Sequence, residues 1–99
     1  MCALGIDERV LERIRTQLRK IYIQGLNDNI IDSGFVVSFY VSANKLVLSV
    51  DQRVLRPKTL TPQHIKALEK DLMEVIAMFG FKGLRIQDVR GNILLDRMF

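Results

Sequence analysis

Cysteine and histidine are nearly absent from this chain. Cys2 is the only cysteine among its 99 residues, and His64 is the only histidine. A single cysteine excludes an intrachain disulfide. One cysteine and one histidine are also too few for the usual ligand sets of a zinc site. The sequence also lacks G-x-S-x-G, P-loop, paired-cysteine and H-E-x-x-H patterns. We therefore expect no enzymatic activity, no metal and no cofactor.

Long apolar runs are missing as well. No stretch approaches the ~20 apolar residues that a helix needs to cross a bilayer. The first residues, MCALGIDERV, do not combine a basic segment with a long apolar one, as a signal peptide would. We expect neither a signal peptide nor a transmembrane segment. Together with the single cysteine, which fits a reducing compartment, this favours a cytoplasmic or intravirion location.

Apolar residues are nevertheless plentiful, and they make up 48% of the chain. A chain of this length buries roughly 60–70% of its extended surface, which is enough for a core without disulfides. No Pro/Ser-rich linker or low-complexity tract divides the sequence, so we expect a single domain over residues 1–99. The net charge of +4 permits anionic partners without requiring them.

The clearest local pattern covers residues 61–79. Thr61 suits the N-cap of a helix, Pro62 suits its first position, and Gly80 suits a left-handed C-cap. The apolar residues recur at steps of three and four, which places them on one face of a helix: Ile65, Leu68, Leu72, Val75, Ile76 and Phe79. We predict an amphipathic helix with this face in the core.

A first amphipathic helix is predicted from Asp7 to about Ile23. Its apolar stripe consists of Val10, Leu11, Ile14, Leu18, Ile21 and Tyr22. The opposite face holds Arg9, Arg13, Thr16 and Lys20. This basic face fits either a solvated helix surface or a surface that follows a phosphate backbone.

Two strands and a turn are predicted between the helices. Residues 35–41 alternate, with Phe35, Val37, Phe39 and Val41 on one face and Val36, Ser38 and Tyr40 on the other. Residues 42–45 form a turn, and Leu46, Leu48 and Val50 continue the apolar face. The open face of this hairpin would show Val36, Tyr40 and Val47. We interpret these three residues as a possible protein interface.

A second hairpin is predicted after the second helix, because Arg90-Gly91-Asn92 separates residues 84–89 from residues 93–99. The element order is then αββαββ. This order predicts an α+β fold, a two-layer sandwich in which a mainly antiparallel four-stranded sheet carries two helices on one face.

A possible anion site precedes the second helix. The loop QRVLRPKTL, residues 52–60, contains no acid, and a helix N-terminus offers unpaired N–H groups and a partial positive charge. The predicted site combines free N–H groups at Gln63 and His64 with Arg56, Lys58, Thr59 and Thr61. A solvated basic loop is the alternative interpretation.

Residues 29–36, NIIDSGFV, lie between a helix and a hairpin and are followed by a second helix. This run resembles the N-I-V-D-L-G-L-V stretch of MIP18-type domains, which serve iron–sulfur cluster assembly. The resemblance covers most of residues 8–89 in element order. The cysteine that the family carries in the loop before the second helix is absent from residues 54–61. The resemblance therefore implies no cluster-related role.

Two functions fit the sequence. The first is a small non-enzymatic protein-interaction module that self-associates or forms a subunit of a larger assembly, with the interface named above and an apolar tail of Met98 and Phe99. The second is a nucleic-acid binder, for RNA or DNA, whose basic helix face and loop contact the phosphate backbone. Its binding residues would be Arg9, Arg13, Lys20, Arg56 and Lys58.

Overall fold

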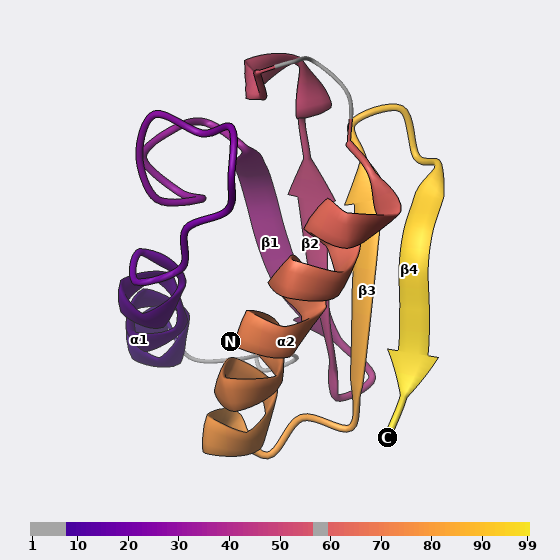
Figure 1. The fold of residues 1–99 in the computed structure, drawn as a ribbon. Helices are drawn as coiled ribbons and strands as arrows, with labels where there is room; N and C mark the ends of the chain where they lie inside the picture. The colour runs from indigo at the N-terminus through magenta and orange to yellow at the C-terminus, as the bar shows by residue number, and fades with distance from the viewer. Residues whose placement is uncertain (1–7, 57–59) are drawn as a thin grey trace.

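The computed structural model describes residues 8–56 and 60–99. The elements follow in the order α1 (Glu8–Leu18), β1 (Val36–Ser42), β2 (Lys45–Val50), the 3₁₀-helix η1 (Gln52–Val54), α2 (Pro62–Phe79), β3 (Gly83–Asp88) and β4 (Ile93–Met98) (Figure 1). The fold is α+β, and the order of helices and strands is the predicted one, with η1 added before α2. Lys58, Thr59 and the predicted cap Asp7 lie outside the described residues.

The four strands form one sheet in the order β1-β2-β3-β4. The two hairpins are antiparallel, but β2 and β3 run parallel, with Lys45 opposite Gly83 and Val50 opposite Asp88. The sheet is therefore mixed, and the predicted mainly antiparallel sheet is wrong. The reason is α2, which carries the chain back from the end of β2 to the level of its start, so that β3 runs in the same direction as β2 (Figure 1).

Helix α2 has the predicted start and end signals. The Thr61 hydroxyl accepts a hydrogen bond from the His64 N–H at 3.3 Å, and the Thr61 N–H donates to His64 Nδ1 at 3.1 Å. Gly80 ends the helix in the left-handed conformation at φ 71°. Local signals therefore determine both ends of this helix.

Helix α1 is shorter than predicted, because it ends at Leu18 and not near Ile23. Beyond it the chain is irregular, yet Ile21 and Ile23 remain buried. The Ile21 carbonyl accepts a hydrogen bond from the Ile30 N–H at 2.9 Å. Pairing with the loop that contains Ile30 thus replaces the last turn of the expected helix.

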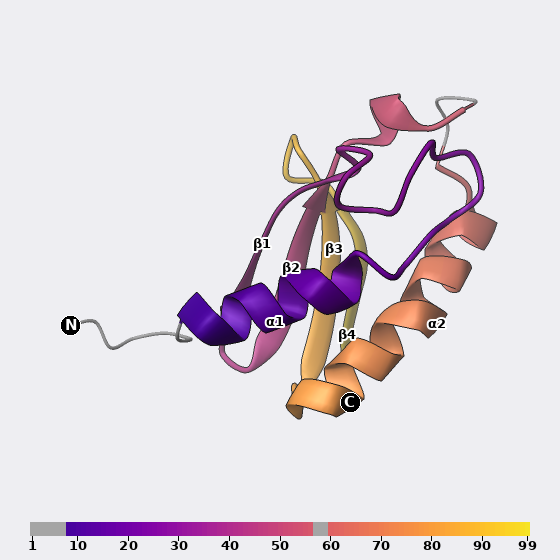
Figure 2. The ribbon, with the colours of Figure 1, turned by 90° about the vertical axis from the view of Figure 1, so that its left-hand side faces the viewer.

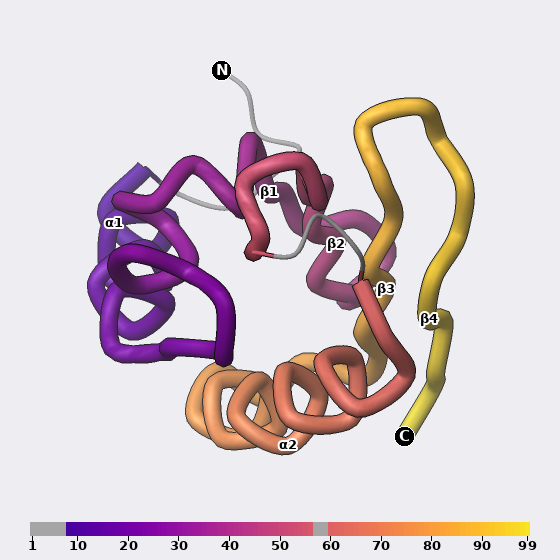
Figure 3. Tube along the Cα trace, turned by 45° about the horizontal axis from the view of Figure 1, so that its top comes forward, coloured from indigo at the N-terminus to yellow at the C-terminus, as the bar shows by residue number. Residues whose placement is uncertain are grey.

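One hydrophobic core joins both helices to the sheet. Alternate residues of the parallel pair, such as Leu46 and Leu48 of β2 and Leu84 and Ile86 of β3, are fully buried. They belong to one cluster with residues of the two helices, namely Ile14, Leu18, Leu68, Leu72, Val75 and Ile76. In Figure 3, α1 lies beside β1 and α2 lies alongside β2 and β3. The core therefore occupies the helix-covered side of the sheet.

The β1–β2 turn contains an unfavourable residue. Ala43 and Asn44 have φ values of 51° and 63°, as the centre of a type I′ turn requires. Asn tolerates this conformation, but for Ala it costs roughly 1–2 kcal/mol. We expect Ala43→Gly to raise the free energy of unfolding by about 0.5–1 kcal/mol, because the strain in the turn exceeds the extra entropy of glycine in the unfolded chain.

Urea unfolding of Ala43→Gly checks this expectation. Ala67→Gly, on the exposed side of α2, is the matched control and should lower stability by about 1 kcal/mol. A lower midpoint for Ala43→Gly than for the parent would contradict the turn assignment.

Candidate protein interface

Two of the three residues predicted for the open sheet face are not exposed. Val36 is part of the core cluster, and only Tyr40 is solvent-accessible, at 46%. The register of the β1–β2 pair shifts between Val36 and Ser38, so Val37 is an extra residue that points outward. This β-bulge turns Val36 inward. The predicted alternation of residues 35–41 is therefore wrong at Val36, which is buried, and at Val37, which is exposed.

Val47 lies on the open face but is only 2% exposed. Its neighbours in the adjoining strands are Tyr40 of β1 and Arg85 of β3. A valine between two long side chains on one pleated surface is easily covered. Val36 and Val47 thus offer no accessible surface to a partner, and the predicted interface reduces to Tyr40.

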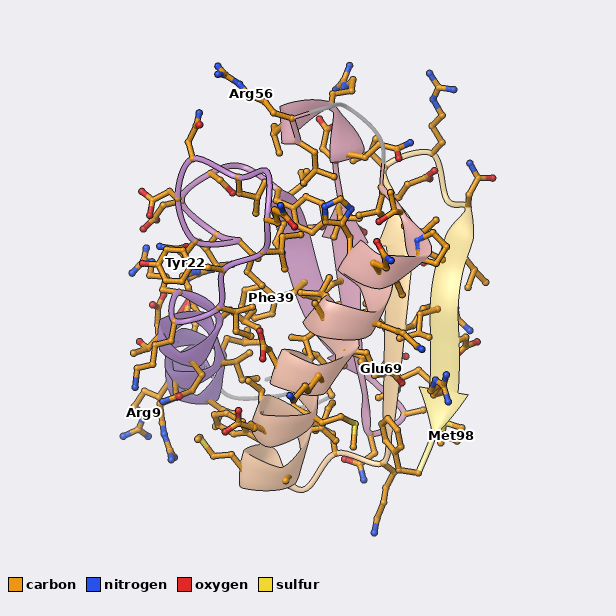
Figure 4. The ribbon with its side chains drawn as sticks, viewed as in Figure 1. Arg9, Tyr22, Phe39, Arg56, Glu69 and Met98 are labelled. Carbon is orange, nitrogen blue, oxygen red and sulfur yellow. The ribbon has the colours of Figure 1, made fainter. Side chains whose placement is uncertain are left out.

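The predicted phosphate-binding residues do not gather in one place. The guanidinium of Arg13 lies 5.5 Å from the centre of the Phe79 ring, at the last residue of α2, whereas Arg56 and Thr61 lie at its start. An 18-residue helix is about 27 Å long. Figure 4 likewise shows Arg9 and Arg56 at opposite ends of the molecule.

Only part of the predicted anion site is assembled. Arg56, Thr61, Gln63 and His64 line a cavity of about 280 Å³. The N–H of His64, which was expected to be free, donates to the Thr61 hydroxyl. Lys20 lines a different hollow, together with Asp71, Glu74 and Met78. The carboxylates of Asp71 and Glu74 would repel a phosphate group bound to Lys20 in this hollow.

The largest group of exposed apolar side chains lies on β4 and the residue after it. Ile93 is 55% exposed, Leu94 36%, Met98 62% and Phe99 51%. In Figure 1, β4 forms one edge of the sheet, and in Figure 2 α1 lies in front while β4 lies behind the other strands. Met98 and Phe99 belong to this group and form the apolar tail that the sequence indicates.

The backbone of β4 is also available. The Phe99 N–H donates to the Lys82 carbonyl at 2.8 Å, and Met98 is the register partner of Gly83. In an antiparallel pair, successive residues direct their backbone groups alternately towards and away from the neighbouring strand. The N–H and C=O groups of Asp96 and Met98 therefore point away from β3, as donors and acceptors for a further strand.

The acidic groups near this edge are engaged. Asp96 forms ion pairs with Lys45 at 2.7 Å and Arg85 at 2.9 Å, and these contacts lower the pKa of its carboxyl group. Glu69 of α2 is paired with Arg97 at 2.6 Å. Asp88 accepts from the Asn92 side chain and from the N–H groups of Asn92 and Arg90, which lowers its pKa.

A second cavity lies at the carboxyl ends of the parallel strands and measures about 270 Å³. Its lining includes Asp51 and Arg53, which form a bidentate pair at 2.8 and 2.9 Å. Hydrogen bonds from the Arg53 side chain and N–H lower the pKa of Asp51 to about 2. Residues 8–56 and 60–99 contain no cluster of three or more His, Cys, Asp or Glu side chains that would hold a metal ion.

The lowered pKa of Asp51 gives a pH prediction. Because the folded-state pKa lies below the ordinary value of 3.8, its contribution to stability is complete above that value. The contribution is lost as the pH falls through about 4 to about 2. We expect Asp51→Asn to be less stable than the parent at pH 7, with a difference that shrinks towards pH 2.

Urea midpoints of both proteins at several pH values test this. Asparagine keeps the capping acceptor but not the charge, so it isolates the ion pair. A difference of the same size at pH 7 and pH 2 would show that Asp51 does not stabilise the fold through its carboxylate.

Among the described residues, no helix is long and apolar enough to cross a membrane. No protein-family model, curated sequence or solved structure matches this chain. The likeness of residues 29–36 to MIP18-type domains therefore remains a short local resemblance.

Proposed function

We propose that this chain is a small non-enzymatic protein-interaction module that self-associates or forms a subunit of a larger assembly, and that β4 is its docking edge. The supporting observation is the coincidence, on one strand, of exposed Ile93, Leu94 and Met98 with outward-facing backbone groups. The proposal includes a two-layer arrangement, with both helices on one face of the sheet, and a cytoplasmic or intravirion location.

An edge strand of this kind suits addition of another strand. Main-chain hydrogen bonds supply affinity in such complexes, and side chains on alternate positions supply specificity. Natural sheets usually protect an edge with a bulge, proline or charges. β4 has a register shift near Ile93 and charges at Asp96 and Arg97, but its two ends carry exposed apolar side chains.

Nucleic-acid backbone binding is the alternative function, and the geometry favours it less. Arg13 and Arg56 are separated by the length of α2, and Lys20 shares its hollow with two carboxylates. A continuous basic track is what a phosphate backbone requires. The part that supports this alternative is the cavity lined by Arg56 and Thr61.

Met98→Pro tests the proposed function. Proline removes the Met98 N–H, which points away from β3, so the ladder between β3 and β4 keeps its bonds. We expect unchanged folding and at least a tenfold loss of association, since an added strand loses a main-chain hydrogen bond and its fit. Light scattering over a concentration series measures self-association, and affinity capture compared between parent and variant measures partner binding.

Two controls make the result specific. Arg97→Pro removes an N–H that points towards β3, and it should lower the thermal midpoint. Tyr22→Ala changes an exposed aromatic residue away from β4 and should leave association intact. The proposal would be refuted by two results together: the parent remains monomeric, and Met98→Pro captures every protein that the parent captures.

A further inference from the structure

We infer that the strand received by β4 belongs to a partner protein and alternates acidic with apolar residues. This inference rests on the proposed function and names the class of partner at that edge. The argument uses the two faces of the sheet separately, because the side chains of an added strand alternate between the same two faces.

On the helix-covered side, the border of β4 is basic. Arg97 belongs to this side, because its side chain reaches Glu69 of α2. Lys82 lies at the end of this border, because its carbonyl accepts a hydrogen bond from the Phe99 N–H, and Lys66 lies one helical turn from Glu69. Lys66 and Lys82 are exposed and have no ion-pair partner among the described residues. Side chains added on this side meet positive charge.

The acids on this side are already used. Glu69 is the ion-pair partner of Arg97, and its side chain is only 18% exposed. If two copies paired through β4, Arg97 and Lys82 of one copy would lie near the same cations of the other copy. Like charges directly opposite each other destabilise a strand pair. The same cations attract carboxylates of an incoming strand. Charge therefore selects an acidic partner over a second copy.

On the open side, the border of β4 is apolar at both ends. Met98 pairs with Gly83 and Ile93 pairs with Gln87, so both side chains lie on the face opposite the core. Between them Asp96 pairs with both Lys45 and Arg85, and the side chains of these two cations are only 18% and 33% exposed. Side chains added on this face meet Met98 and Ile93, which favours apolar residues. The two faces together specify a strand with a period of two, acidic towards the helices and apolar towards the open face.

A labelled seven-residue peptide of alternating glutamate and valine, with capped ends, is the probe. Fluorescence anisotropy with the full chain at low salt should show saturable binding. We expect about tenfold weaker binding for a lysine–valine peptide, for a glutamate–valine peptide with the residues in two blocks, and for Met98→Pro. Lys82→Glu should weaken binding of the glutamate–valine peptide and strengthen that of the lysine–valine peptide.

Each other outcome has a definite meaning. Equal binding of the glutamate and lysine peptides, or binding that Met98→Pro leaves unchanged, overturns the inference. Binding of a single-stranded DNA oligonucleotide, with none of the peptide, overturns it in favour of a phosphate backbone. Concentration-dependent dimers that Met98→Pro abolishes, without peptide binding, overturn the inference but leave the proposed function standing. If the chain forms no dimers, binds no peptide and captures the same proteins as Met98→Pro, both the inference and the proposed function fail.

Discussion

Replacement of Leu72 by aspartate is expected to prevent the chain from folding. Leu72 is fully buried in the cluster shared by both helices and the sheet. The substitution removes an apolar side chain, which alone costs about 2–5 kcal/mol, and introduces a carboxylate without a partner, which costs several kcal/mol more. This sum approaches the 5–15 kcal/mol that is typical for the whole free energy of unfolding. Circular dichroism and the loss of a cooperative thermal transition measure the result.

Two variants separate core burial from helix propensity. Leu72→Ala keeps a strong helix former and should lose about 2–5 kcal/mol while remaining folded. Ala67→Asp places the same carboxylate on the exposed side of α2 and should cost less than about 1 kcal/mol. A cooperative transition of Leu72→Asp close to that of Ala67→Asp would contradict the assignment of Leu72 to the core.

The parts that sequence reasoning predicted well depend on residues close together in the chain. The ends of α2 follow from Thr61, Pro62 and Gly80, and the apolar residues of α2 recur with the period of a helix. The two hairpins were found for the same reason, because a turn joins each pair of strands. Local chemistry is therefore enough to indicate these elements.

The parts that were wrong depend on contacts that no periodic pattern in the sequence indicates. The direction of β3 is set by the crossover through α2, which connects the two hairpins, and the hairpin turns carry no information about it. The early end of α1 reflects the pairing of Ile21 with Ile30. Strict alternation also fails at the bulge, where the extra residue leaves Val36 in the core and Val37 exposed.

The candidate interface shows the same division. Exposure of Tyr40 follows from alternation, but burial of Val47 depends on side chains from two neighbouring strands. Of the exposed apolar group on β4 and at Phe99, the sequence indicates only the apolar tail of Met98 and Phe99. Strand order decides which strand lies at an edge, and strand order is a property of the whole sheet.

Asn29 is expected to be the most sensitive polar position, and Asn29→Asp should lower the free energy of unfolding by about 3 kcal/mol. Its side chain is buried and makes hydrogen bonds in both directions. The oxygen Oδ1 accepts from the N–H groups of Ile31 and Asp32 at 2.9 and 2.8 Å. The nitrogen Nδ2 donates to the carboxylates of Asp28 and Asp32 at 3.3 and 2.8 Å. Aspartate at this position still accepts the two backbone hydrogen bonds. It cannot donate to Asp28 and Asp32, and its own carboxylate repels theirs.

A compensating change distinguishes this cause from a general disturbance of the loop. In the double variant Asn29→Asp with Asp32→Asn, the amide of residue 32 can donate to the carboxylate of residue 29, so about half of the lost stability should return. Asp32→Asn alone loses the weak pair with Arg19, whose closest atoms are 3.5 Å apart, and should cost less than about 1 kcal/mol. Urea unfolding of the three variants completes a double-mutant cycle. Additive losses in that cycle would show that Asn29 acts through the shape of the loop alone. A recovery in the double variant would show that the interaction between the side chains of residues 29 and 32 stabilises the loop that contains buried Ile30.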